Sequence, residues 1–375
     1  NEMLLEGVHP DAIAFVSCLK ACTCIGAIEM GEDVHLEIEK RGLLEDPAVG
    51  CALISMYAKC GFLKKARKVF DKLPVQNIFS WTALISGYAE QGHGEEALDC
   101  LAHMSLEGLS PDDVTYLCIL KACGCVGAIG KGREIHAQLE KNGLLESDPA
   151  SGIALVDMYC KCGSLHLAQE VFDKLPVQDT TLWNSLMAGY AQLGDSENVL
   201  NVFDSMLKKS VTPNHITFVI ILNACSRTGL CHQSQTYFQA MSRDYGIEPT
   251  AQHYNRMLDI LGRAGMLEEC IKLINSMPMR ATTTTWMTLL GACKMHSDEE
   301  RGKFAASQVF KLEPECATPY VLLSNIYAST GNWKESDKLR KIMKDKGIEV
   351  HHHEDGFIKD IEKTYVCGTD AVSHC

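Results

Sequence analysis

The chain has 375 residues, of which 46% are apolar and 22% are charged, and its net charge is −13. This composition supports a large buried core and excludes an intrinsically disordered chain. The acidic balance argues against a protein that grips duplex nucleic acid through broad positive charge. The longest apolar stretches, such as 216–222, are far shorter than the roughly 20 residues that cross a bilayer.

The 18 cysteines are spread along the chain, and many stand within helical patterns. This distribution favours small buried hydrophobic residues in a reducing compartment over a disulfide framework. Close pairs such as Cys22 and Cys24 are of the Cys-x-Cys type. Zinc knuckles instead use Cys-x-x-Cys with a matching second pair. The sequence therefore predicts no metal site and no cofactor.

A long internal repeat organises the chain. The motif Phe-Asp-Lys-Leu-Pro-Val-Gln at 70–76 returns at 172–178, which is 102 positions later. Met-Tyr-x-Lys-Cys-Gly at 56–61 returns at 158–163 with the same offset. Within each copy a weaker pattern recurs about every 35 residues. Periods of this size are typical of a solenoid, in which each unit buries its apolar face against its neighbours.

Each unit is predicted to be a helical hairpin. Apolar residues at helical spacing form a first helix, a glycine-containing break follows, and a second amphipathic helix closes the unit. In the unit that begins at 78, the break falls at 91–94 and the second helix at 95–104. No strand pattern appears within the repeats, so the chain is expected to be all-α. The aromatic residues that open the first helices are Phe15, Trp81, Tyr116, Trp183, Phe218, Tyr254, Trp286 and Tyr320.

Three unit types resemble those of the plant pentatricopeptide repeat family, in its PLS subgroup. Residues 115–123, 52–61 and 80–88 are similar to its L, S and P types respectively. The resemblance implies a right-handed superhelical solenoid of antiparallel helix-turn-helix repeats. The expected units are the end of a preceding repeat at 1–11, L at 12–46, S at 47–77, P at 78–112, L at 113–148, S at 149–179, P at 180–214, L at 215–250 and S at 251–282, which together make the array 12–282.

The C-terminal part resembles other motifs of the same family. The hairpins at 283–316 and 317–350, together 283–350, are similar to its E1 and E2 motifs. The tail at 351–375 resembles part of the E+ extension. The chain opens in mid-motif without an initiator Met, so it is expected to be a piece of a longer protein with further repeats upstream.

In this family one repeat meets one base of single-stranded RNA, and the fifth and the last residue of the unit are implied to discriminate that base. Thr82 and Asp112 hold these places in the first P unit and imply guanine, since a carboxylate accepts from the guanine ring N–H and amino group. Apolar residues at the second position would sandwich the base. These second-position candidates are Phe79, Val114 and Ile216.

The other polar pairs imply pyrimidines. Asn184 and Asn214 of the second P unit are associated with cytosine in preference to uracil, and Asn255 with Thr282 of the last S unit form a less specific pair. The alternative interpretation is that such residues are ordinary helix caps. The remaining units give weaker RNA-contact candidates, interpreted mainly as spacers. These are Val16, Asp46, Cys51, Asn77, Leu117, Asp148, Ile153, Asp179, Val219 and Thr250.

Such family members usually select the cytidine that is edited to uridine in organellar transcripts. The resemblance implies a site-recognition factor in the mitochondrion, or alternatively the chloroplast, that recruits a DYW-type deaminase or other editing-complex proteins through 283–375. The last S unit would lie about four nucleotides upstream of the edited cytidine, the Asn184 unit about six and the Thr82 unit about nine. Alternatives are an RNA stability or splicing factor, and a protein scaffold similar to tetratricopeptide arrays.

The chain itself is not expected to be an enzyme. A zinc deaminase needs His-x-Glu followed by Pro-Cys-x-x-Cys, so that a zinc-bound water and a general acid meet the base. His352 and Glu354 supply the first half, but only Cys367 and Cys375 follow. A deaminase would therefore have to come from another protein or from a further domain.

Overall fold

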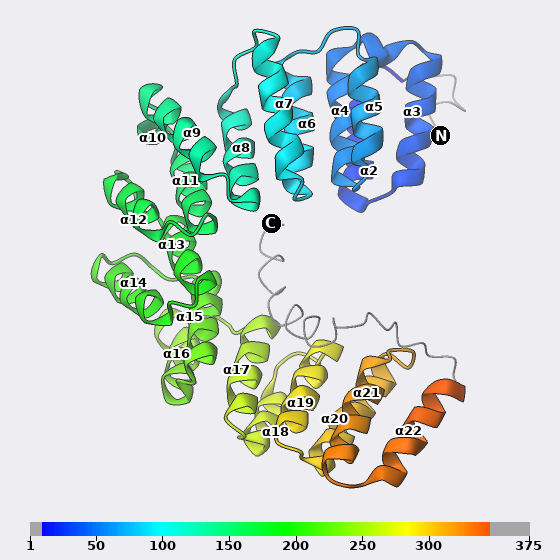
Figure 1. The fold of residues 1–375 in the computed structure, drawn as a ribbon, viewed down its shortest axis with the longest axis vertical. Helices are drawn as coiled ribbons and strands as arrows, with labels where there is room; N and C mark the ends of the chain where they lie inside the picture. The colour runs from blue at the N-terminus through cyan, green and yellow to red at the C-terminus, as the bar shows by residue number, and fades with distance from the viewer. Residues whose placement is uncertain (1–9, 346–375) are drawn as a thin grey trace. The chain divides into compact units, whose positions relative to one another are not determined.

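The computed structural model describes residues 10–345, and within that range the chain is helical with no strand (Figure 1). Helical hairpins follow one another along the sequence, so the predicted all-α solenoid architecture is confirmed. The chain divides into two compact units, Asn1–Ala224 and Cys225–Cys375, with the boundary inside one helix.

In the first unit each first helix is followed by its hairpin partner. The pairs are α2 (Ala12–Ile25) with α3 (Ile28–Lys40), α4 (Pro47–Lys59) with α5 (Leu63–Lys72), α6 (Ile78–Glu90) with α7 (Gly94–Leu106), α8 (Asp113–Val126) with α9 (Ile129–Lys141), α11 (Pro149–Lys161) with α12 (Leu165–Lys174), and α13 (Thr180–Gln192) with α14 (Ser196–Lys208). Two short turns, η1 (Leu43–Glu45) and α10 (Leu144–Ser147), precede α4 and α11. Successive first helices pack on one another, from α2 through α4, α6, α8 and α11 to α13.

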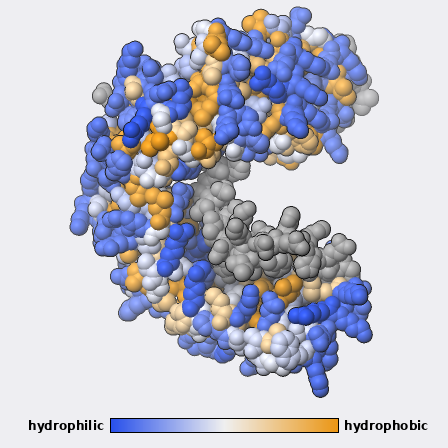
Figure 2. Space-filling view, viewed as in Figure 1, coloured by the Kyte–Doolittle hydropathy of each residue, from blue (hydrophilic) through white to orange (hydrophobic). Residues whose placement is uncertain are grey.

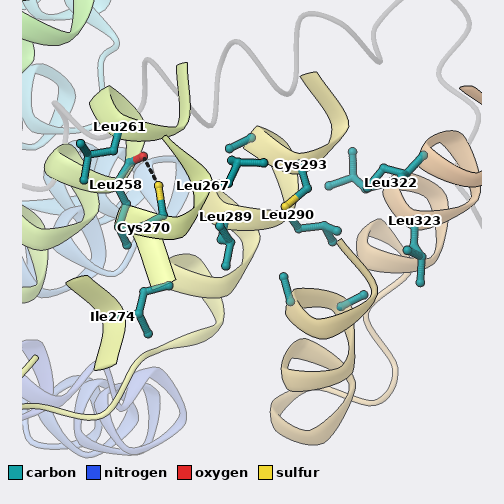
Figure 3. Close-up of a cluster of buried hydrophobic side chains, with 14 of the residues drawn as sticks. Leu258, Leu261, Leu267, Cys270, Ile274, Leu289, Leu290, Cys293, Leu322 and Leu323 are labelled. Atoms are coloured by element: carbon teal, nitrogen blue, oxygen red, sulfur yellow. Dashed lines mark hydrogen bonds between the residues drawn. The ribbon is translucent and has the colours of Figure 1, made fainter. Parts of the chain in front are cut away.

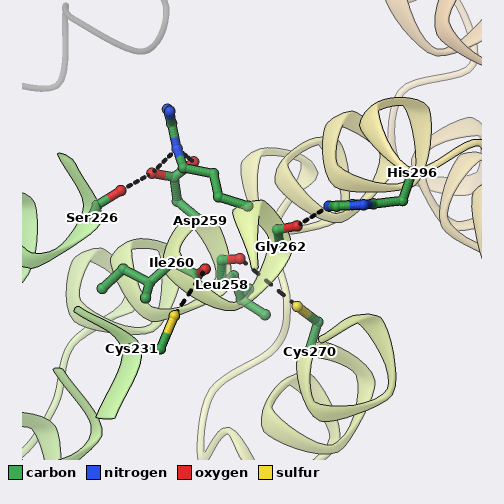
Figure 4. Close-up of polar contacts among 9 residues, drawn as sticks. Ser226, Cys231, Leu258, Asp259, Ile260, Gly262, Cys270 and His296 are labelled. Carbon is green, nitrogen blue, oxygen red and sulfur yellow. Dashed lines mark hydrogen bonds and ion pairs between the residues drawn. The ribbon is translucent and has the colours of Figure 1, made fainter. Parts of the chain in front are cut away.

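The boundary helix is α15 (His215–Thr228). The second unit continues with α16 (Cys231–Tyr245), α17 (Ala251–Arg263), α18 (Leu267–Ser276), α19 (Thr283–Met295), α20 (Glu299–Leu312), α21 (Thr318–Ser329) and α22 (Trp333–Asp345). Its core runs along the first helices α17, α19 and α21, where Leu258, Leu289 and Leu322 belong to one buried cluster (Figure 3). Polar contacts also join neighbouring hairpins here. Asp259 of α17 accepts from Ser226 of α15, and His296 Nε2 lies 2.8 Å from the Gly262 carbonyl (Figure 4).

Side-chain caps explain where the first helices begin. The Asp112 carboxylate accepts from the Thr115 backbone N–H at 2.8 Å, and Asp179 does the same for the Leu182 N–H at 2.9 Å. Such caps satisfy backbone donors that have no partner within the helix. The helices so capped begin at 113 and 180, where an expected L unit and an expected P unit begin respectively. Helix bounds do not define repeats, so the division into L, S and P units stays a prediction.

The motif that repeats after 102 residues forms an aromatic contact between hairpins. Phe70 at the end of α5 lies 4.4 Å, centroid to centroid, from Trp81 of α6. Phe172 and Trp183 make the same edge-on contact at 4.6 Å. All four rings are buried. The two sequence copies therefore repeat one packing arrangement, in which the second helix of one hairpin contacts the first helix of the next.

Successive first helices approach closely because glycine faces a small residue. A Cβ atom at Gly87 of α6 would lie 2.4 Å from the Ala58 Cβ of α4. A Cβ atom at Gly189 of α13 would lie 2.1 Å from the Cys160 sulfur of α11. Real side chains do not come so near, so these positions require glycine for steric reasons.

Candidate nucleic-acid interface

The predicted fifth and last residues meet at the junction between two successive first helices. A fifth residue lies in the second turn of one first helix, and the last residue is the N-cap of the next. The alternative interpretation of these residues as helix caps is thus correct for Asp112, Asn214 and Thr282, each of which accepts from a backbone N–H. Capping occupies one oxygen and leaves the rest of the side chain available for another partner.

At the junction of α6 and α8, Thr82 and Asp112 are connected through a third residue. The Thr82 hydroxyl lies 2.7 Å from the Thr115 hydroxyl, which donates to Asp112 Oδ1 at 2.6 Å. Thr82 is 9% exposed. The structure therefore brings the predicted pair together in one hydrogen-bonded chain.

At the junction of α13 and α15, the two asparagines bind each other directly. Asn184 Nδ2 donates to Asn214 Oδ1 at 3.1 Å, and the Thr217 hydroxyl donates to Asn184 Oδ1 at 2.7 Å. The Thr217 backbone N–H also donates to Asn214 Oδ1. Asn184 is only 6% exposed, so its amide is held by neighbours rather than by solvent.

At the junction of α17 and α19, a similar arrangement holds the third pair. The Thr285 hydroxyl donates to Asn255 Oδ1 at 2.9 Å and lies 3.1 Å from the Thr282 hydroxyl. The sequence reasoning missed this third residue in all three junctions. Its signal was present, because threonine recurs at Thr115 and Thr217 with the 102-residue offset of the long repeat.

The second-position candidates differ in exposure. Phe79 is 70% exposed and Val114 is 55% exposed, and they stand at the second position of the packed helices α6 and α8 that hold Thr82 and Asp112. Ile216 is half-buried. Figure 2 shows hydrophobic side chains exposed among hydrophilic ones on the visible face of the first unit. Exposed apolar groups beside a polar pair are suited to covering the faces of a planar ring.

The weaker candidates form simpler junctions. Their fifth residues, Val16, Cys51, Leu117, Ile153 and Val219, are all half-buried. Asp46, Asn77, Asp148 and Asp179 cap the next helix through their side chains, and Thr250 lies 2.8 Å from a ring nitrogen of His253. Ile153 and Asp179 line one shallow pocket together with Leu182. Among the described residues, no hydrogen bond joins the fifth to the last residue of these units.

Within residues 10–345, no group of His, Cys, Asp or Glu side chains could hold a metal ion, and none of the helices is long and apolar enough to cross a membrane. Burial raises the pKa of the Cys100 thiol to about 11 and that of Cys160 to about 12, as expected of packed and unreactive thiols. The His352–Glu354 motif and the expected E+ tail lie outside the described residues.

Comparison with known proteins agrees with this architecture. The PPR repeat family model matches residues 76–125 and 178–227, and the PPR repeat model matches 51–78, 154–178 and 253–280. The E motif model matches 296–352.

Similar proteins are found in Arabidopsis thaliana. A chloroplastic pentatricopeptide repeat-containing protein is 39% identical over 93% of this chain and 47% of its own length. A mitochondrial one is 37% identical over 91% of this chain and 40% of its own length. The chain thus spans less than half of these two relatives.

Two solved structures share the fold. The pentatricopeptide repeat protein PPR10 in complex with an 18-nt psaJ RNA element superposes with a TM-score of 0.66 at 19% identity, over 92% of this chain and 52% of that one. PPR10 from maize gives a TM-score of 0.52 at 20% identity, over 93% of this chain and 55% of that one. The matched repeats and E motif, the relatives and the fold together show that this chain belongs to the pentatricopeptide repeat family, in the PLS subgroup.

Proposed function

We propose that the chain is a sequence-specific single-stranded RNA-binding protein in which one helix junction contacts one base. The observation that carries this proposal is a hydrogen-bonded link at three junctions between the fifth residue of one unit and the cap of the next. The link is direct between Asn184 and Asn214 and passes through a threonine hydroxyl at the other two junctions. The pair beside Phe79 and Val114 combines polar atoms for a base edge with exposed apolar groups for its faces. PPR10, which has the same fold, has been solved with RNA.

The three junctions predict a spaced sequence in the RNA. With one base per unit, the Thr82 junction contacts guanine, and the Asn184 junction contacts cytosine in preference to uracil three nucleotides further downstream. The Asn255 junction contacts a pyrimidine two nucleotides beyond that. The expected motif is therefore guanine, any two bases, cytosine, any base, pyrimidine, written from 5′ to 3′.

We further propose that the RNA-binding array selects a cytidine for conversion to uridine in an organelle. The E motif supports this role, because the resemblance associates it with editing factors. One similar protein is described as chloroplastic and another as mitochondrial, which supports an organellar location. The mitochondrion is our first choice and the chloroplast the alternative.

The hairpins at 283–345 are proposed to recruit the deaminase. They expose large apolar side chains, with Trp333 62% exposed and Phe304, Leu312 and Ile342 also accessible. Exposed apolar groups of this size on hairpins that follow the RNA-binding array are suited to a protein partner. A DYW-type deaminase supplied in trans, or as a further domain, would provide the zinc-bound water that residues 10–345 do not provide.

Filter binding tests the RNA proposal. The chain is titrated with a single-stranded RNA that carries the expected motif, with the same RNA in which adenine replaces the guanine, and with a duplex of the same sequence. Tight binding of the first RNA and weaker binding of the other two is expected. Equal binding of the first two RNAs would exclude the guanine assignment, and no binding of single strands would favour the protein-scaffold alternative.

The editing role has a separate test. Transcriptome sequencing after loss of the gene should show that a single C-to-U event has disappeared, about nine nucleotides downstream of a guanine. A change in transcript abundance or splicing with editing intact would instead favour the stability or splicing alternative.

A further inference from the structure

At the Thr82 junction, both hydroxyls of the hydrogen-bonded chain donate in the same direction, toward Asp112. A carboxylate only accepts, so the hydroxyl of Thr115 must donate its proton to Asp112 Oδ1. The Thr115 oxygen then accepts the proton of the Thr82 hydroxyl. Thr82 has no proton left, and Asp112 Oδ2 has no hydrogen bond to the described residues. This junction therefore offers only acceptors to a ligand.

At the Asn184 junction, a backbone N–H fixes the opposite arrangement. The Thr217 backbone N–H can only donate, so Asn214 must turn its oxygen inward, and Asn184 must then present Nδ2 to that oxygen. The Thr217 hydroxyl has two acceptors within reach, Asn184 Oδ1 at 2.7 Å and Asn214 Oδ1 at 3.2 Å, and its one proton goes to the nearer one, which holds the Asn184 carbonyl on the protein side. Both N–H groups of Asn214 and one N–H of Asn184 remain unused by the described residues. This junction therefore offers mainly donors.

These two sets match two different bases. The Watson–Crick edge of guanine carries two adjacent donors, its ring N–H and its amino group, which suit the acceptors at Thr82 and Asp112. The edge of cytosine carries two adjacent acceptors, its ring nitrogen and its carbonyl oxygen, which suit the donors at Asn184 and Asn214. At the first junction the atoms left free depend on the Thr115 hydroxyl, whereas at the second the Thr217 backbone N–H orients Asn214 and the Thr217 hydroxyl holds the Asn184 carbonyl.

We propose that the threonine at the third position of the following unit, Thr115 at one junction and Thr217 at the other, is a specificity-positioning residue that sets which hydrogen-bonding atoms the pair presents to the base. This inference rests on the proposed RNA-binding function. Thr115 and Thr217 are fully buried and act through their partners, so they need not touch the RNA.

Removing each hydroxyl should change base preference in a different direction. In Thr115→Val the Thr82 proton is released and can donate to the ring nitrogen of adenine, so adenine should gain on guanine at that position. In Thr217→Val the Asn184 carbonyl loses the hydroxyl that holds it on the protein side, so the Asn184 amide can turn over, give up its bond to Asn214 and present its carbonyl to the ring N–H of uracil. Uracil should then gain on cytosine. We expect the affinity ratio of guanine to adenine in the first variant, and of cytosine to uracil in the second, to fall by about ten-fold. This is the discrimination carried by one good hydrogen-bonded pair. The backbone N–H that caps each helix is kept in both variants.

The chain offers a matched control. Ser151 is also a fully buried third-position hydroxyl and binds its cap Asp148 at 2.9 Å, but its junction has Leu117 at the fifth position. Ser151→Ala removes a hydroxyl of the same kind without altering a polar pair. Thr115→Ser and Thr217→Ser retain the hydroxyl and should restore the wild-type preference.

The test is selection of bound RNAs from a random single-stranded pool by the full chain and by each variant, followed by sequencing. Circular dichroism checks that each variant keeps its helix content. The wild type should select the expected motif, Thr115→Val should change only the guanine position, Thr217→Val only the cytosine position, and Ser151→Ala neither. Unchanged preferences in the valine variants, or an equal loss at every position, would overturn the inference. No motif for the wild type would overturn the proposed function itself, and this inference with it.

Discussion

The two copies of the long repeat differ in the hydrogen-bond partner of one buried tryptophan, and this difference predicts a stabilising substitution. In the first copy, Trp81 Nε1 donates to Glu107 Oε2 at 3.0 Å. In the second copy, the residue that corresponds to Glu107 is Lys209, whose ammonium lies 5.4 Å from the centre of the Trp183 ring. Trp183 Nε1 is buried and has no hydrogen-bond partner.

Lys209→Glu should therefore stabilise the second copy. An unpaired buried donor costs about 1–3 kcal/mol, and the glutamate would remove that cost. The substitution forfeits the cation–π contact, worth about 0.5–1 kcal/mol at an exposed site, and an exposed hydrogen bond from Lys209 Nζ to Gln178. The free energy of unfolding should rise by about 1 kcal/mol.

The reverse exchange in the first copy is the control. Glu107→Lys leaves Trp81 Nε1 without its acceptor and should lower the free energy of unfolding by about 1–2 kcal/mol. Denaturant unfolding followed by circular dichroism measures both, and hydrogen exchange in α13 localises the gain to the second copy. If Lys209→Glu destabilises the chain while Glu107→Lys has no effect, the reasoning from the unpaired indole is wrong.

Three further predictions concern packing, stacking and pH. Gly189→Ala should lower the free energy of unfolding by about 1–3 kcal/mol through overpacking against α11, whereas Gly130→Ala, where a Cβ meets open space, should be neutral or stabilising in the same denaturant titration. Phe79→Ala should weaken filter binding of the motif RNA about ten-fold, whereas Leu106→Ala, an exposed residue of a second helix, should not. Burial lowers the pKa of His136, whose Nδ1 lies 2.9 Å from a tyrosine hydroxyl, so the folded protein favours the neutral imidazole. The stability that neutral His136 contributes is therefore present above pH 6.5, the ordinary pKa of histidine, and is lost as the pH falls below that value. The denaturant concentration at the unfolding midpoint should thus decrease when the pH is lowered from 7 to 5.5, and His136→Gln should make that decrease smaller.

The sequence was sufficient to predict the helical hairpins because their signals are local. Aromatic residues such as Trp81 and Trp183 lie on the buried side as expected, and residues such as Asp112 begin the next helix where a cap was plausible. The pairing of Thr82 with Asp112 came from the family resemblance, and the structure brings the two residues together.

The rest depends on contacts between units that no single repeat contains. The role of Thr217 requires knowing that its hydroxyl lies between Asn184 of the preceding unit and its own cap, Asn214. Whether the indole N–H of Trp183 is paired depends on the residue at 209, 26 positions away. The equivalent Trp81 has its acceptor, so comparison of the two copies alone does not predict an unpaired indole. The base preferences themselves remain predictions for the RNA selection described above.

The glycines between successive first helices also define the spacing of the junctions. Gly87 and Gly189 have no side chain to hold neighbouring helices apart, so the distance from one junction to the next is set by backbone packed against the small side chains of Ala58 and Cys160. A larger residue at Gly87 would shift each later junction of the first unit relative to the earlier ones. Under the proposed function, such a substitution would abolish RNA recognition while every residue proposed to contact a base is intact.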